Sequence, residues 1–185
     1  MKKSNHLKIS IYDMCSIAIF TAVISILAQI SIPMPTGVPL TLQTFAVTLT
    51  AIVLGAKKSA GALLVYLLLG TIGIPVFANF RGGLHAITSP TGGFLISFPV
   101  MAYIIGLSVE KRTSKWLFPL MITVGTAFNY ISGLIFYCMN TETSLFSGFL
   151  VCVLPFLPSG IITTFLASIL GLKLRKRLAH GSFHP

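Results

Sequence analysis

GIPVFANFRGGLHAITSPTGG, residues 73–93, separates two long apolar runs and concentrates glycine, proline and polar side chains in a chain that otherwise has few of them. A polar, glycine-rich segment between two apolar runs is typical of a loop that joins two helices. We therefore predict a loop over residues 76–91, and the runs on both sides of it indicate the kind of helical bundle to which it belongs.

The composition of the whole chain places these runs in a membrane. Only 9% of the residues are charged, against about 25% in a typical soluble domain, and 55% are hydrophobic. Six spans of about 20 residues each would use roughly two thirds of the 185 residues. Residues 1–185 are therefore expected to form a single membrane domain.

The apolar runs predict an all-α integral membrane protein with both termini on the same side of the bilayer. A short interfacial piece is expected over residues 146–157, because Pro155 and Pro158 interrupt that apolar segment. The six predicted transmembrane helices cover approximately residues 10–31, 41–56, 59–75, 92–109, 116–138 and 158–176.

The distribution of basic residues predicts the orientation. Twelve of the 13 Lys and Arg residues lie in segments that would face one side of the membrane, and Arg81 alone lies on the other. Because basic loops face the cytoplasm, both termini are expected there, in a bacterial cell membrane, with residues 76–91 outside. The same scatter of charge argues against nucleic-acid binding, which needs a basic face.

The sequence lacks the residues that most enzymes need. The only acids, Asp13, Glu110 and Glu142, lie near the ends of predicted spans, and there is no P-loop or paired carboxylate. The three cysteines are far apart, so no metal site or cofactor is expected. We predict a protein that is not an enzyme and that has no ATPase of its own.

The loop at residues 76–91 is the first candidate site. Asn79 offers both a donor and an acceptor, and Arg81 can form two hydrogen bonds with a carboxylate. Gly83 permits close approach of the backbone to a ligand, Phe77 could form an apolar wall, and His85 could add positive charge. The alternative is a solvated loop with an incidental charge.

Polar residues inside the apolar runs are the second candidate set. Gln43, Tyr66, Asn129 and Tyr130 each need a hydrogen-bond partner in lipid. Bonds between helices would account for each of them singly, and a shared polar pocket would account for all of them.

Three similar triplets, at residues 35–37, 90–92 and 158–160, precede or begin predicted helices. Thr91 and Gly92 belong to the second triplet and Gly160 to the third. Proline followed by Ser or Thr is typical of helix initiation, which would suffice to account for the triplets. The functional interpretation is that three helix N-termini converge on an outward cavity for an anion.

The chain resembles the BioY family, the biotin-binding S-components of energy-coupling-factor (ECF) vitamin transporters. The resemblance is carried by PLTLQTFAVTLTAIVLG (39–55), YLLLGTIGIPVFANF (66–80) and SPTGGFLISFP (89–99). It implies six helices, an outward-facing biotin site, a transmembrane coupling protein and two cytoplasmic ATPase subunits as partners. Ala18 and Ala22 match the family's AxxxA docking motif.

The chain departs from the family at the last helix, where many members carry an Asp and a Lys that contribute to the site. Gly160 and Thr163 stand at those positions. Our hypothesis is that Arg81, aided by His85 and the helix N-terminus, supplies the positive potential instead. A lipoate-like ligand, a self-sufficient carrier and a membrane enzyme are the alternatives.

Overall fold

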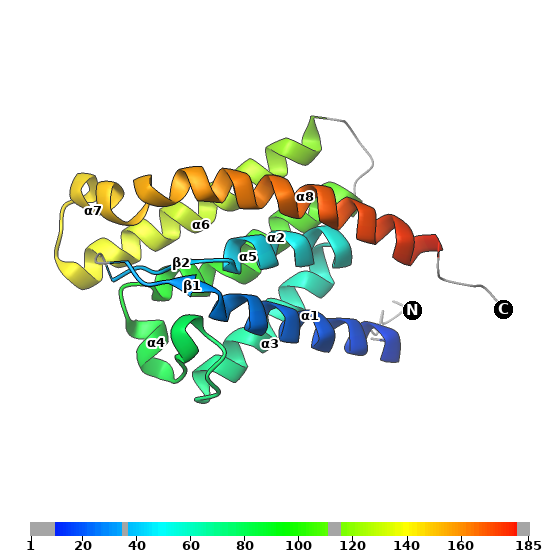
Figure 1. Ribbon diagram of the computed structural model, residues 1–185, viewed down its shortest axis with the longest axis horizontal. Coiled ribbons are helices and arrows are strands. Elements are labelled where there is room, and N and C mark those ends of the chain that lie inside the picture. The colour runs from blue at the N-terminus through cyan, green and yellow to red at the C-terminus, as the bar shows by residue number, and fades with distance from the viewer. Residues whose placement is uncertain (1–9, 35–36, 111–115, 181–185) are drawn as a thin grey trace, which may run out of the picture.

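The computed structural model describes residues 10–34, 37–110 and 116–180. Six longer helices form a bundle, and most run along the longest axis of the molecule (Figure 1). The first of them begins, and the last ends, at the same end of the bundle. The helices are α1 (Ile11–Gln29), α2 (Gln43–Leu54), α3 (Ala56–Thr71), α5 (Gly92–Glu110), α6 (Leu117–Thr141) and α8 (Leu157–His180).

Both boundaries of the third predicted helix differ from the structure. The helix expected over 59–75 is α3, which begins at Ala56 and ends at Thr71. It begins early because Gly55, with φ of 79°, ends α2 and turns the chain directly into α3. It ends early because Gly73, with φ of 107°, and Pro75 interrupt the helical backbone.

Two predicted irregular segments contain short helices. The loop at residues 76–91 includes the 3-10 turn η1 (Ala78–Phe80) and α4 (Leu84–Thr88). The interfacial piece expected over 146–157 is α7 (Leu145–Cys152) followed by η2 (Leu154–Phe156). Ser144 caps α7, because its hydroxyl accepts a hydrogen bond from the backbone N–H of Ser147.

A small β-ribbon joins α1 to α2 at the opposite end of the bundle from the start of α1 (Figure 1). Strand β1 (Ser31–Ile32) pairs antiparallel with β2 (Leu40–Thr41). Pro33 and Pro39 adjoin these strands, and a residue before proline favours extended backbone over helix. The predicted helices 10–31 and 41–56 are therefore each shortened at this end.

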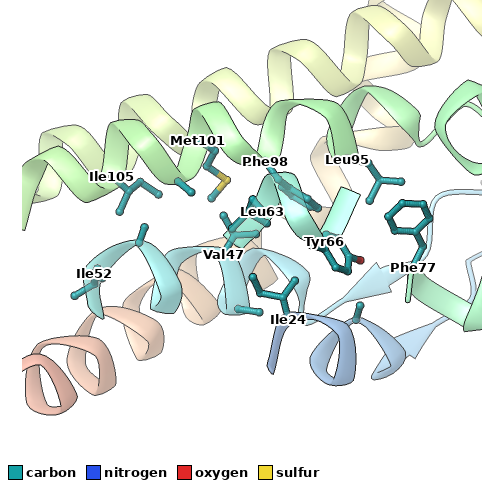
Figure 2. Packing of buried hydrophobic residues seen from close by; sticks show 14 of the residues in the cluster. Ile24, Val47, Ile52, Leu63, Tyr66, Phe77, Leu95, Phe98, Met101 and Ile105 are labelled. Atoms are coloured by element: carbon teal, nitrogen blue, oxygen red, sulfur yellow. The ribbon is translucent and has the colours of Figure 1, made fainter. Parts of the chain in front are cut away.

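Helix α2 is the centre of the bundle, because it packs against α1, α3, α5 and α8. The main apolar core lies around it and draws residues from α1, α2, α3, α5 and the loop after α3 (Figure 2). The largest side chains of this core include Ile24, Val47, Leu63, Tyr66, Phe77, Phe98, Met101 and Ile105.

The outer surface is apolar, which fits a multi-pass membrane protein. Large apolar side chains such as Ile19, Ile131 and Phe165 are more than half exposed. Four helical segments of the described chain are long and apolar enough to cross a bilayer: Ile11–Gln29, Gly92–Glu110, Leu117–Thr141 and Leu145–Leu178. The 12-residue helix α2 rises roughly 18 Å, which is shorter than the hydrocarbon core.

Charged side chains close the end of the bundle at which α1 begins. Glu110 accepts a hydrogen bond from the backbone N–H of Ala56 at 2.8 Å, at the N-terminus of α3. The Arg175 guanidinium donates to the carbonyls of Ile52 and Val53, at the C-terminus of α2. Both contacts place charge where the helix dipole favours it. Asp13 and Lys58 form an ion pair between α1 and α3.

Candidate functional site

A cavity lies at the end of the bundle that carries the β-ribbon and α4. It is lined by the ribbon, by the loop after α3, and by the first turns of α2, α5 and α8, together with two residues of α6. The lining residues are Val38, Pro39, Leu40, Thr41, Gln43, Thr44, Phe77, Ala78, Arg81, Ala86, Ser89, Thr91, Phe94, Leu95, Phe98, Asn129, Tyr130, Ser159, Gly160 and Thr163.

The cavity brings together many of the residues that the sequence singled out. These are Gln43, Phe77, Arg81, Thr91, Asn129, Tyr130, Gly160 and Thr163. The remaining candidates do not line it: Tyr66, Asn79, Gly83, His85 and Gly92.

Gln43 and Tyr66 form a polar connection between the cavity and the buried core. The amide nitrogen of Gln43 donates to the Tyr66 hydroxyl at 2.8 Å, and the amide oxygen accepts from the Thr41 hydroxyl at 3.0 Å. The Tyr66 hydroxyl in turn donates to the carbonyl of Val76 at 3.2 Å. Tyr66 therefore supports the cavity from behind and does not line it.

Phe77 anchors the loop after α3. A Cβ added at Gly70 would lie 2.0 Å from the Phe77 ring, so the ring packs directly on the α3 backbone. The ring also meets Tyr66 edge to face, with 5.3 Å between centroids (Figure 2). Phe77 is 2% exposed. This fixed ring forms part of the apolar lining of the cavity.

Asn129 joins α6 to α5 at the edge of the cavity. Its amide nitrogen donates to the Phe94 carbonyl at 2.9 Å and to the Ser97 hydroxyl at 2.7 Å. Its side-chain carbonyl oxygen accepts no hydrogen bond from any residue that the structure describes. Asn129 combines a fixed orientation with an available acceptor.

Arg81 follows η1 and is exposed at the cavity rim. Its backbone carbonyl accepts from the N–H of Phe77 at 3.0 Å, which closes a tight turn. Within residues 10–34, 37–110 and 116–180, the guanidinium forms no hydrogen bond or ion pair with another residue. Arg81 therefore places at the cavity a charge that has no counter-ion among the described residues.

Asn79 and His85 differ from their predicted roles. Asn79 has φ of 59°, and its side-chain oxygen accepts from the Ser31 hydroxyl at 2.6 Å, away from the cavity. This left-handed backbone lies two residues before Arg81 and turns the two side chains to different surroundings. His85 is exposed on α4 and does not line the cavity.

Gly83 and Gly92 have structural roles in the loop. Gly83 has φ of 93°, and its N–H donates to the Gly70 carbonyl at 2.6 Å, tying the loop to α3. A Cβ at Gly92 would lie 1.6 Å from the Ile87 carbonyl oxygen, so only glycine allows α5 to begin against α4. Both glycines shape the loop without lining the cavity.

The first two turns of α8 contain Gly160 and Thr163, the positions at which many similar proteins carry an Asp and a Lys. Here these turns offer backbone and hydroxyl groups and no charged side chain. The Thr163 hydroxyl donates to the carbonyls of Ser159 and Gly160, at 2.8 and 3.1 Å. The Ser159 hydroxyl donates to Phe156 at 3.0 Å. Both hydroxyl protons are therefore used within the start of α8, and no charged side chain of α8 lines this side of the cavity.

The N-terminal ends of α2, α5 and α8 all contribute residues to the cavity. The predicted triplets lie at the starts of only two of these helices. Triplets 90–92 and 158–160 lie at the starts of α5 and α8. The triplet 35–37 precedes β2, and its residues 35 and 36 lie outside the described residues. Helix α2 begins at Gln43 instead, where the Thr41 hydroxyl accepts from the Gln43 N–H at 3.3 Å.

Sequence reasoning missed the contribution of the ribbon and of several cavity neighbours. The signal for the ribbon was the proline spacing of residues 33–39, which disfavours helix. The missed residues are Val38, Pro39, Leu40, Thr41, Ala78, Ala86, Ser89, Leu95 and Phe98. In the described part of the chain no group of His, Cys, Asp or Glu could hold a metal ion.

Ala18 and Ala22 are both exposed on α1, one turn apart, and neither lines the cavity. Side chains four residues apart lie on one helix face. This face of α1 is accessible to another helix in the membrane.

The family model described as the BioY family matches residues 1–180. The chain belongs to the BioY family. The biotin transporter BioY of Thermotoga maritima is 40% identical over 161 residues, covering 85% of this chain and 92% of that protein. BioY2 of Lactococcus lactis is 36% identical over 171 residues, covering 92% of this chain and 93% of that protein.

A solved structure matches the fold over nearly the whole chain. The crystal structure of the S-component for biotin from an ECF-type ABC transporter matches with a TM-score of 0.81. The two are 25% identical, and the match covers 95% of each chain. The fold is therefore that of an ECF S-component, mostly helical, in a multi-pass membrane protein.

Proposed function

We propose that this chain is the biotin-binding subunit of an ECF-type ATP-driven vitamin importer. The observation that carries the proposal is the cavity at one end of the bundle, where Gln43, Arg81 and Asn129 meet the first turns of three helices. The relatives named as biotin transporters and the fold of a biotin S-component support it.

The cavity offers a plausible match for each part of biotin. The free side-chain oxygen of Asn129 suits an N–H of the ureido ring, and Phe77, Phe94 and Phe98 supply apolar surface for the rings. The Arg81 guanidinium suits the carboxylate of biotin. That carboxylate would be the counter-ion that the described protein residues do not provide. Thr91 and Thr163 complete the polar edge.

A second small carboxylated ligand, such as a lipoate-like molecule, is the alternative. The observation that favours it is the first turn of α8, where Gly160 and Thr163 offer no charged side chain. Both ligands carry a carboxylate for Arg81. Only biotin has urea nitrogens that need the Asn129 acceptor.

The subunit is proposed to work in a membrane assembly. Its partners would be a transmembrane coupling protein, which contacts the face of Ala18 and Ala22, and two ATPase subunits, because this chain is proposed to have no ATPase of its own. Six membrane-spanning helices, with the ribbon end outside and both termini in the cytoplasm of a bacterial cell, fit the basic residues Lys57, Lys58 and Lys173 at one end of the bundle.

The experiment that tests the function is ligand identification followed by binding. Native mass spectrometry of the purified protein should find biotin of unaltered mass, since no chemistry on the ligand is proposed. Titration with biotin and with lipoate should then give tighter binding of biotin. Tighter binding of lipoate would identify the lipoate-like molecule as the ligand instead of biotin. Binding of neither molecule would contradict the proposal. Uptake by vesicles lacking the ATPases would contradict the importer assembly.

A further inference from the structure

Two hollows of the molecule share one wall. The ligand cavity and a second, larger groove between α6 and α8 both include Tyr130 and Gly160 in their lining. The exposed surface of the groove is mostly apolar and is formed by side chains such as Ile122, Phe165 and Leu172. It exists because α6 packs along α5 whereas α8 packs along α2. Both of its helices belong to membrane-spanning segments, so the groove faces lipid.

The wall consists of a side chain from one helix and a bare backbone from the other. A Cβ added at Gly160 would lie 2.2 Å from the Tyr130 hydroxyl oxygen, a separation that real Cβ atoms do not adopt. The next ring atom, Cζ of Tyr130, would lie 3.4 Å away, at the edge of ordinary contact. The hydroxyl oxygen therefore occupies the place where a side chain of residue 160 would begin.

The Tyr130 ring is held in this position by the segment that precedes α8. Its hydroxyl donates to the Phe156 carbonyl at 3.3 Å, and the same carbonyl accepts from Ser159 at 3.0 Å. The hydroxyl thus connects α6 to the start of α8 and cannot move without losing this bond.

The two sides of the wall differ in polarity. Thr163 lines the ligand cavity, while the next residue, Thr164, lines the groove. The hydroxyls of Thr126 and Thr164, both groove residues, are buried and so contribute little to its exposed surface. A polar ligand that entered the groove would meet a mostly apolar surface and would lose hydrogen bonds, which is costly in an apolar environment.

We propose that the Tyr130 hydroxyl takes the place of a side chain at position 160 and, with the Gly160 backbone, closes the ligand cavity against the lipid-facing groove. Residues 130 and 160 together therefore determine which ligands the cavity retains. The identity of the ligand rests on the proposed function, whereas the wall does not.

The test is a double-mutant cycle with Tyr130→Phe, Gly160→Ala and the double variant. Gly160→Ala should lower the melting temperature of the ligand-free protein and weaken biotin binding about tenfold or more, because the new Cβ displaces the hydroxyl. Tyr130→Phe should have a smaller effect on both. The double variant should return to the level of Tyr130→Phe alone, since removing the oxygen leaves the 3.4 Å contact.

Gly61→Ala in α3 is the matched control. Its Cβ would meet only the Ile17 side chain, at 3.5 Å, so it tests a glycine replacement without a clash. Its effects should add to those of Tyr130→Phe.

Two outcomes would contradict the proposed wall. One is that Tyr130→Phe and Gly160→Ala have additive effects on the melting temperature. The other is a double variant that binds biotin no better than Gly160→Ala. Failure of the wild-type protein to bind biotin is different, because it contradicts the proposed function. The melting cycle would then still decide whether Tyr130 and Gly160 form the wall.

Discussion

The side-chain nitrogen of Gln43 lies 2.8 Å from the hydroxyl oxygen of Tyr66 and donates a hydrogen bond to it. Gln43 is 7% exposed and Tyr66 is fully buried, so the bond is largely shielded from water. The bond links the cavity to the core, because Tyr66 also holds the Val76 carbonyl of the loop. Contacts between a ligand and Gln43 therefore depend on Tyr66, which lies behind Gln43 and does not line the cavity.

Tyr66→Phe should destabilise the protein and weaken biotin binding together. The change removes the acceptor of the Gln43 amide nitrogen, and an unsatisfied buried group costs about 1–3 kcal/mol. It also removes one of the two hydrogen bonds to the Val76 carbonyl, which keeps the one from Gln29. Thermal unfolding and biotin titration measure the two effects. Val65→Ala, at an exposed position of the same helix, is the control. Unchanged binding in Tyr66→Phe would contradict the supporting role.

Arg81→Ala should weaken biotin binding by about one to two orders of magnitude, because a charge-assisted hydrogen bond contributes about 1.5–3 kcal/mol. The loss should be smaller when wild type and variant are compared at high salt, because Arg81 is exposed and its charge is screened. His85→Ala is the control, since His85 lies off the cavity. Equal affinity of Arg81→Ala and wild type at both salt concentrations would remove Arg81 from the site.

Ala18→Trp and Ala22→Trp should each retain biotin binding but lose assembly with the coupling protein. Both side chains are exposed on α1, and a large ring there would keep another helix from close approach. Co-purification of the subunits measures assembly. Ile131→Trp places the same ring on the exposed face of α6 and should assemble normally. Intact complexes in both α1 variants would argue against this docking face.

Arg175→Met should lower thermal stability more than Lys173→Met, which alters an exposed side chain on the same helix. The guanidinium holds three carbonyls, those of Ile52, Val53 and Val109, and so joins α8 to α2 and α5. Arg175→Lys should recover only part of the stability, because one ammonium group cannot reproduce the planar set of donors. Equal melting temperatures of Arg175→Met and Lys173→Met would contradict this role.

The sequence allowed the main helices and the polar loop to be predicted, because membrane spans need long apolar runs. It did not show that Arg81 lines the cavity and that Asn79, two residues earlier, does not. The left-handed backbone of Asn79 and Phe80 decides which side chain lines the cavity, and this depends on contacts from other elements. The placement of Tyr66 behind Gln43 likewise depends on how α2 meets α3, which no single-helix pattern predicts.

Gln29, the last residue of α1, holds the loop from both sides. Its amide nitrogen donates to the Val76 carbonyl at 3.1 Å, and its amide oxygen accepts from the Phe80 N–H at 2.8 Å. Ala22 lies seven residues earlier, about 10 Å along the same helix. One helix thus carries both the anchor of the loop beside the cavity and the exposed alanine face, so a displacement of the loop that Gln29 followed would reach that face through α1.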